Sequence, residues 1–167
     1  AGQLPKVAEL IQRDFDEKWF SNPEMRSQDE AVLRTVKEGV SPFKAEVAQY
    51  FSTFVNSAEE YQAEISKLKE LSVRNLAGVI TTNYDEFLER QFAGYTRYIG
   101  QNELIFSSIQ GVAEIYKIHG SVDKPDSLVI NEADYIEFAA KSKYLAAKLM
   151  TIFMEYPIIF MGYSLSD

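Results

Sequence analysis

The fold of this chain is decided by the stretch Leu76-Ala77-Gly78-Val79-Ile80-Thr81-Thr82-Asn83-Tyr84-Asp85. Its first half is a short apolar run with β-branched residues, which is typical of a buried strand, and its second half is polar. Residues 86–92, which follow at once, have the pattern of a helix. A strand, a polar turn and a helix in this order indicate a βα unit of a parallel sheet.

Two further polar segments follow apolar runs in the same way. Ile118-His119-Gly120-Ser121 comes after a predicted strand over residues 113–118, and Gly162-Tyr163-Ser164-Leu165 comes after one over residues 157–161. A helix is predicted over residues 143–156, and residues 128–130 are a further candidate strand. Strands separated by helices favour right-handed crossovers and a parallel sheet. Because ligands bind beyond the carboxyl ends of such strands, we expect the three polar segments to converge on one cleft.

The first half of the chain has the apolar spacing of consecutive helices. Pro5 is suited to a first helical turn, Gly39 to a helix end, and Ser41-Pro42 to the start of the next helix. The apolar residues predicted to face the core are Val7, Leu10, Ile11, Phe15 and Trp19 in one helix and Phe43, Val47, Tyr50, Phe51 and Phe54 in another.

We therefore predict a single α/β domain over residues 1–167. Residues 1–75 form a mainly helical part that packs on a βα part over residues 76–167, which carries the ligand cleft. A helix opens the chain without a strand before it, and Ser166-Asp167 stand where another helix is expected. The natural protein is thus expected to continue on both sides.

Composition narrows the class of protein. The 167 residues include 46% hydrophobic ones, enough for a substantial core, and show neither a membrane-spanning run nor a signal peptide. Cysteine is absent, which excludes disulfides and thiolate zinc sites and fits a cytoplasmic protein. The formal charge of -8 argues against nucleic acid as a partner.

The polar segments hold the candidate site residues. The amide of Asn83 both donates and accepts hydrogen bonds while ionised Asp85 only accepts, so the pair suits a ligand with hydroxyl and amide groups. An Asn or Asp after a strand more often caps the following helix, and Asp85 stands where it can do so. His119, the one histidine of the chain, can accept a proton near neutral pH, and Gly120 permits close approach of a ligand. A lone histidine is more often structural, and Ser164 suits either a ribose or phosphate contact or a helix cap.

These segments resemble, in order and spacing, the signature segments of the SIR2 (sirtuin-like) family, and in particular its bacterial branch. The matching stretches are Thr81-Thr82-Asn83-Tyr84-Asp85, Lys117-Ile118-His119-Gly120-Ser121, residues 158–165 and residues 129–135. The resemblance implies a Rossmann-like, doubly wound domain that takes NAD+ as its substrate, with no metal. It implies that Asn83 orders the ribose and the attacking water, that Asp85 holds the nicotinamide carboxamide and that His119 acts as a base. The residues that it implies for cofactor binding are Thr81, Thr82, Asn83, Asp85, Gly120, Gly162 and Ser164.

Departures from the family pattern refine the expected activity. The zinc module of the protein deacylases needs four cysteines, and this chain has none. In addition, Thr82 and Tyr84 replace residues that are usual in the deacylase motif. Both departures favour NAD+ hydrolysis over deacylation. The family's glycine-rich phosphate loop is not in the sequence, so this stretch by itself is expected to bind pyrophosphate incompletely. We expect an NADase effector of a larger bacterial anti-phage protein with a further sensing region. The alternatives are an ADP-ribosyltransferase, a non-catalytic NAD or ADP-ribose sensor, and a helical part that forms homo-oligomers.

Overall fold

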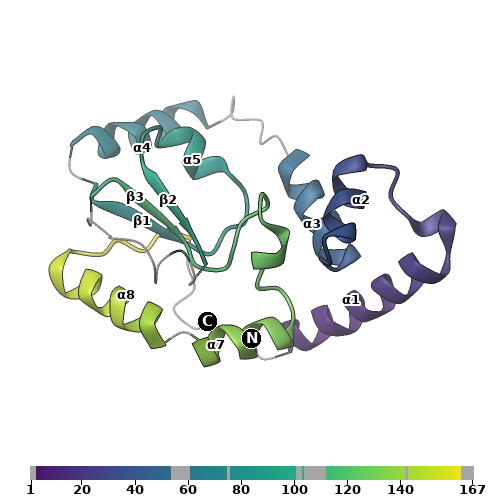
Figure 1. Ribbon diagram of the computed structural model, residues 1–167. Helices are drawn as coiled ribbons and strands as arrows, with labels where there is room; N and C mark the ends of the chain where they lie inside the picture. The colour runs from purple at the N-terminus through teal and green to yellow at the C-terminus, as the bar shows by residue number, and fades with distance from the viewer. Residues whose placement is uncertain are drawn as a thin grey trace.

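The computed structural model describes residues 3–53, 61–74, 76–100, 103, 112–141 and 143–162. Its centre is a three-stranded parallel sheet with helices on both faces (Figure 1). The group formed by α1 (Leu4–Ser21), α2 (Glu30–Lys37) and α3 (Pro42–Thr53) lies beside the sheet, and the segment that contains η2 (Pro125–Ser127) runs between the two (Figure 1). The predicted α/β, Rossmann-like class is confirmed.

The sheet places its last strand in the middle. β1 (Gly78–Thr81) and β2 (Thr96–Ile99) both pair in parallel with β3 (Glu114–Lys117), which gives the order β1-β3-β2. The predicted strands over residues 76–80 and 113–118 are thus confirmed, whereas β2 was not predicted. Parallel strands need crossover connections, and α5 (Phe87–Gln91) lies in the one between β1 and β2.

The two faces of the sheet pack against different helices. Ile80, Tyr116 and Tyr98 form one row across the sheet, and α8 (Lys143–Glu155) packs on this face through Leu145 and Leu149. Successive side chains of a strand point to opposite faces, so Lys117 points to the other face, where it meets Glu89 of α5. Helices on both faces make the sheet doubly wound.

β3 carries two buried charged side chains in a stretch predicted to be an apolar strand. At its amino end the carboxylate of Glu114 accepts hydrogen bonds from the hydroxyls of Tyr116 and Tyr98, the latter at 3.4 Å. Burial, together with the hydrogen bond and charge of Glu114, raises the pKa of Tyr116 above its ordinary value. The rings of Tyr98 and Tyr116 stack with their centroids 5.8 Å apart.

The helical elements begin and end close to their sequence signals. Pro5 lies in the first turn of α1, Gly39 has φ +96 just after α2, and Ser41 directly precedes α3. Within the described ranges, no helix has both the length and the apolar character that a membrane crossing would need. The elements are α1 (Leu4–Ser21), η1 (Pro23–Met25), α2 (Glu30–Lys37), α3 (Pro42–Thr53), α4 (Gln62–Arg74), η2 (Pro125–Ser127) and α7 (Glu132–Lys141).

The faces that α1 and α3 bury differ from those predicted. Trp19 of α1 is buried as expected and Phe15 is partly buried with its ring edge-on to Phe43, but the predicted core residues Val7, Leu10 and Ile11 are exposed. In α3 the small residues Ala45 and Ala48 are buried with Lys44, while Tyr50 and Phe51 are exposed; Phe54 lies outside the described residues. These helices also dock through polar contacts, which an apolar pattern does not reveal.

One such contact joins α1 to α3 and to the start of α7. Gln12 of α1 donates to Ser41 Oγ at 3.0 Å and accepts from Asn131 Nδ2 at 2.7 Å. Asp16, one turn further along, accepts from the Ser41 hydroxyl at 2.7 Å and from the Phe43 N–H at 2.8 Å. The carboxylate of Asp16 therefore fixes the start of α3 against α1.

A second contact joins α3 to α7. The buried Lys44 ammonium donates to the Leu128 carbonyl at 2.8 Å and to Asp134 Oδ1 at 2.6 Å. Asp134 Oδ2 accepts from the N–H groups of Ile130 and Asn131 at 3.0 and 3.1 Å. The irregular segment 128–131 is thus held from both sides by one ion pair.

Two predicted strands are wrong. Residues 128–130 and 157–161 have no strand in the structure, and Ile159 and Met161 are 83% and 73% exposed. A strand exists only where a neighbouring strand receives its backbone hydrogen bonds, and the structure pairs neither segment with the sheet. Apolar, β-branched composition alone therefore misassigned both segments.

The Lys44–Asp134 ion pair is expected to contribute far more to stability than the Lys6–Glu132 pair, which joins α1 to α7. Lys44→Met removes one donor from the Asp134 carboxylate and one from the Leu128 carbonyl. The side chains of Lys44 and Asp134 are only 11% and 17% exposed, so water replaces the lost donor poorly. We expect the substitution to lower the free energy of unfolding by about 3 kcal/mol. The matched control is Lys6→Met, which breaks the Lys6–Glu132 pair, 63% and 39% exposed, and should cost at most about 1 kcal/mol. Equal losses in urea titrations would contradict this assignment.

Candidate functional site

The first candidate segment forms a tight turn at the carboxyl end of β1. Thr81 Oγ1 accepts a hydrogen bond from the Asn83 N–H at 3.0 Å, and the Asn83 side chain is exposed. Asp85 Oδ1 accepts from the Phe87 N–H at 2.8 Å, at the first residue of α5. The helix-capping role that was open for Asp85 is therefore present, and it fixes the direction of the carboxylate.

The second candidate segment turns sharply at the carboxyl end of β3. Gly120 has φ +93, and a Cβ at this position would lie 2.3 Å from the carbonyl oxygen of Ser127. The next residue, Ser121, is fully buried, and its N–H donates to Ser127 Oγ at 3.1 Å. Glycine is required here because the backbone of η2 packs directly against it.

These two segments lie side by side, as predicted. The Val122 N–H donates to the Tyr84 carbonyl at 3.0 Å, and the Tyr84 hydroxyl donates to the Val129 carbonyl at 2.6 Å. The Val129 N–H in turn donates to the His119 carbonyl at 3.0 Å. Burial, with the nearby Tyr135 and Asp134, raises the Tyr84 pKa to about 12, so Tyr84 stays neutral and able to donate.

Of the third candidate segment the structure describes only Gly162. Gly162 is exposed with φ +64, and a Cβ added there would meet no atom within 4 Å. Ser164 lies outside the described residues. The ligand contacts of Gly162, Ser164, Thr81 and Thr82 stay predictions.

His119 is half-buried against α7. Its ring packs edge-on against Tyr135 and Phe138, with centroid separations of 5.6 and 5.3 Å. Burial lowers the pKa of His119 below its ordinary value of 6.5, because the charged imidazolium loses hydration there. The imidazole is therefore neutral at pH 7, the state in which it can accept a proton.

The sequence reasoning missed Lys117, the last residue of β3. Its side chain is fully buried, and its ammonium donates to the carbonyl oxygens of Tyr84, at 3.1 Å, and of Asp85. It also forms an ion pair with Glu89 Oε1 at 2.9 Å. A lysine inside a predicted buried strand was the available signal, since buried lysines need specific partners.

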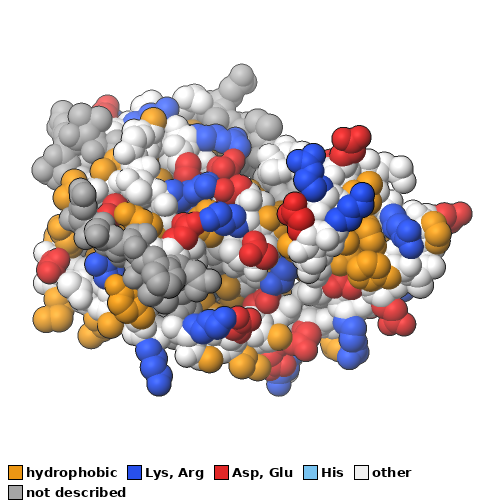
Figure 2. All heavy atoms as spheres, in the orientation of Figure 1, with side chains coloured by type: hydrophobic (Ala, Val, Ile, Leu, Met, Phe, Trp, Pro, Cys, Tyr) orange, Lys and Arg blue, Asp and Glu red, His pale blue; other side chains and the backbone are white. Residues whose placement is uncertain are grey.

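Ion pairs surround the outer side of this region. Arg97 contacts Asp123 at 2.5 Å and Glu86 at 3.3 Å, and Lys124 pairs with Glu103. Figure 2 shows basic and acidic side chains interleaved over the surface near α5. The charges of this part of the surface are therefore largely neutralised locally.

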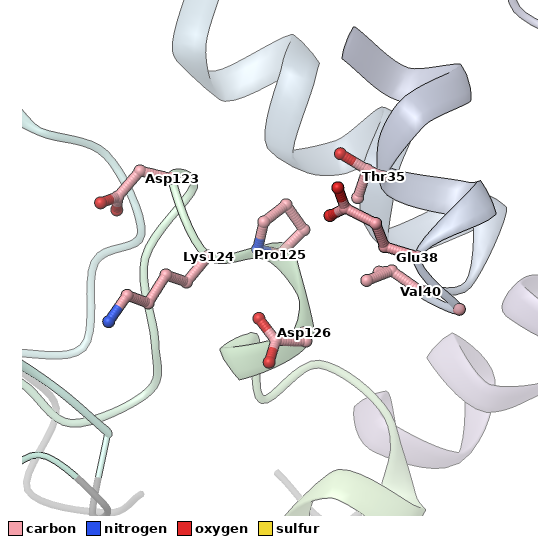
Figure 3. Close-up of a pocket in the computed structure, with 8 residues that line it drawn as sticks. Thr35, Glu38, Val40, Asp123, Lys124, Pro125 and Asp126 are labelled. Atoms are coloured by element: carbon pink, nitrogen blue, oxygen red, sulfur yellow. The ribbon is translucent and has the colours of Figure 1, made fainter.

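A groove of about 450 Å³ lies beside the candidate site, between the end of α2 and the loop that follows Ser121. In Figure 3 Glu38 and Asp126 lie on opposite sides of it, while the ammonium of Lys124 points away. Its lining contains none of the three predicted catalytic residues. Within the described ranges, no cluster of His, Cys, Asp and Glu side chains is arranged to hold a metal ion.

The fold and the two strand-end loops define an α/β protein of the doubly wound, Rossmann-like class. The sequence model of the family described as "SIR2-like domain" matches residues 77–167, more than half of the chain. The chain therefore belongs to the SIR2-like family, and the resemblance found in its signature segments is confirmed.

A relative of named biological role is Defense-associated sirtuin 2 of Bacillus subtilis. The two are 28% identical in an alignment 102 residues long, which covers 56% of this chain and 10% of that protein. The chain thus spans only about a tenth of the relative that it matches.

Replacing Gly120 by alanine is expected to destabilise the protein more than the same change at Gly39. Both glycines have positive φ, +93 and +96, but a Cβ at Gly39 would meet no atom within 4 Å whereas one at Gly120 would clash with Ser127. Gly39→Ala should cost about 1 kcal/mol of conformational strain. Gly120→Ala should cost at least about 2 kcal/mol more, because the backbone of η2 must move. Similar midpoints in thermal unfolding of the two variants would contradict this.

The lowered pKa of His119 predicts a direction for the pH dependence of stability. The unfolded chain binds the histidine proton more tightly than the folded protein, so stability is full above pH 6.5 and falls as the pH drops towards the folded-state pKa. Relative to His119→Gln, the wild-type protein should lose unfolding free energy between pH 7 and 5, by no more than about 1.4 kcal/mol per pH unit. Denaturant titrations at several pH values measure this, and a wild-type gain on acidification would exclude a buried neutral His119.

Proposed function

We propose that this domain binds NAD+ and cleaves the bond between nicotinamide and ribose, releasing nicotinamide and ADP-ribose. The observation that carries the proposal is the juxtaposition of two strand-end loops in a SIR2-like chain. One loop bears a neutral, half-buried His119, the other bears Asn83 and Asp85, and the Val122 N–H bonds the Tyr84 carbonyl between them.

The proposed chemistry assigns a separate task to each residue. Cleavage passes through an oxocarbenium-like ribose, so the site must orient the sugar, tolerate positive charge and accept a proton. Asn83 orients the ribose and the water, and the Asp85 carboxylate, held in direction by the Phe87 N–H, binds the nicotinamide carboxamide and offsets the developing charge. The bond between ribose and nicotinamide nitrogen breaks, the water oxygen bonds to the same carbon, and His119 takes the water proton.

The larger role that we propose is defence. The relative named Defense-associated sirtuin 2 supports the proposal that this protein acts in bacterial defence by consuming NAD+. In this proposal other parts of the protein sense the trigger of the defence response and control access to the site. Further copies of the chain are proposed to join it in a homo-oligomer.

A second candidate is a non-catalytic module that holds NAD+ or ADP-ribose. The edge-on packing of His119 between Tyr135 and Phe138 favours it, because such a ring environment also suits a structural histidine. Transfer of ADP-ribose to a macromolecule is a third outcome of the same site chemistry, with the acceptor in place of water.

The test is product analysis of NAD+ incubated with the purified full-length protein. We expect nicotinamide and free ADP-ribose from the wild-type protein, and at least about 100-fold less from His119→Ala and from Asn83→Ala. The matched control is Asn22→Ala, which removes an exposed asparagine that caps η1; it should cleave NAD+ at the wild-type rate.

Other outcomes of this experiment distinguish the alternatives. Nicotinamide release with labelled ADP-ribose bound covalently to a macromolecule would replace hydrolysis by transfer. Equal NAD+ binding by the wild-type and His119→Ala proteins, without consumption by either, would contradict the hydrolase proposal and support the binding module.

A further inference from the structure

The polar contacts of Lys117 all fall on one short stretch of chain. Its ammonium donates hydrogen bonds to the carbonyls of Tyr84 and Asp85 and forms an ion pair with the carboxylate of Glu89. These partners belong to the turn after β1 or to α5, which follows it directly. A fully buried ammonium is costly to desolvate, so these contacts explain how the charge is tolerated.

The position of Lys117 links the two halves of the candidate site. Lys117 is the last residue of β3 and lies two residues before His119. The carbonyl groups that accept its hydrogen bonds belong to Tyr84 and Asp85, in the same turn as the side chains of Asn83 and Asp85. The Tyr84 and Asp85 carbonyls point inwards to Lys117. Asn83 remains exposed, and the Asp85 carboxylate is directed at the start of α5. The orientation of this turn therefore depends on the donors below it.

Removing the ammonium would leave the partly buried Asp85 carbonyl without its lysine donor and the Tyr84 carbonyl with only the Val122 N–H. An unsatisfied buried acceptor costs about 1–3 kcal/mol, enough to make the turn rotate until water reaches it. Such a rotation moves Asn83 and Asp85 relative to His119. A misplacement of about 1 Å at a catalytic group can cost about 100-fold in rate.

We propose that Lys117 is a positioning residue, which holds the Asn83–Asp85 turn at a fixed place relative to His119 through the backbone carbonyls of Tyr84 and Asp85. The consequence for catalysis rests on the proposed NAD+ cleavage, whereas the consequence for the turn itself does not. Lys117 touches no reacting atom in this proposal.

The experiment separates positioning from charge neutralisation by a paired substitution. Lys117→Met alone should lower both stability and turnover, because it leaves the largely buried Glu89 carboxylate with only Arg97, 3.8 Å away, as a cationic partner. Lys117→Met/Glu89→Gln removes that charge and should regain most of the stability. If Lys117 positions the turn, the double variant keeps a kcat about 100-fold below wild type, with KM for NAD+ changed by less than about fivefold.

Glu89→Gln alone provides the reciprocal test and does not depend on the methionine variants folding. It removes the ion pair but leaves the ammonium on the two carbonyls, so the loss in kcat should stay below about threefold. The matched control is Lys141→Met/Glu137→Gln, which removes an i,i+4 pair that is 60% and 64% exposed and should change neither stability nor kcat.

Amide hydrogen exchange gives a readout that needs no NAD+ turnover. In the double variant, peptides covering residues 82–90 should exchange about tenfold faster than in the wild-type protein, while peptides from α8 stay unchanged. If the wild-type protein does not cleave NAD+, the proposed function fails and this exchange alone decides the positioning role. Wild-type exchange at residues 82–90 in the double variant would overturn it, as would recovery of wild-type kcat along with stability.

Discussion

The loops at the carboxyl edge of the sheet turn some of their backbone carbonyl groups inwards, where these groups take hydrogen-bond donors from inside the protein. Two lysines supply these donors. Lys117 reaches the carbonyls of Tyr84 and Asp85 from β3, and Lys44 reaches that of Leu128 from α3. Each ammonium is neutralised by one carboxylate, Glu89 or Asp134, so that neither charge is left unpaired in a poorly hydrated place. The geometry of the candidate site is therefore set by cations that lie beneath it.

The helical part of the chain contributes to the site through a series of hydrogen bonds, in addition to the apolar contact of Ala48 with Val122 and Leu128. Lys44 and Asp134 order residues 128–131, and within that segment Val129 bonds both the His119 carbonyl and the Tyr84 hydroxyl. The same segment is joined to α1 through Asn131 and Gln12. A change in how α1 and α3 sit on α7 would thus be transmitted to His119 through three or four defined contacts.

Short sequence patterns predicted many of the strands, turns and helices of this structure. They failed where the conformation or burial of a segment depends on contacts with residues far along the chain. The strand–turn–helix pattern after Leu76, the start of α3 and the convergence of the first two polar segments followed from residue order alone. The strand at residues 157–161 was wrong because strand formation depends on a neighbour, which composition does not encode. The buried faces of α1 and α3 were misassigned because Gln12, Asp16 and Lys44 dock through polar groups that resemble surface residues in sequence. Lys117 was overlooked for the same reason, although a lysine in a buried strand demands an explanation.

The order of the strands has a consequence for how the protein is made. β1 and β2 pair only with β3 in the described sheet, and β3 is the last of the three to leave the ribosome. Until β3 has been synthesised, the described β1 and β2 lack the strand that joins them, and long-range parallel pairing of this kind is slow and prone to misassociation. Both loops of the candidate site stem from strands of this pairing. The described sheet and the two loops are therefore brought together in the same event, which comes after the synthesis of β3.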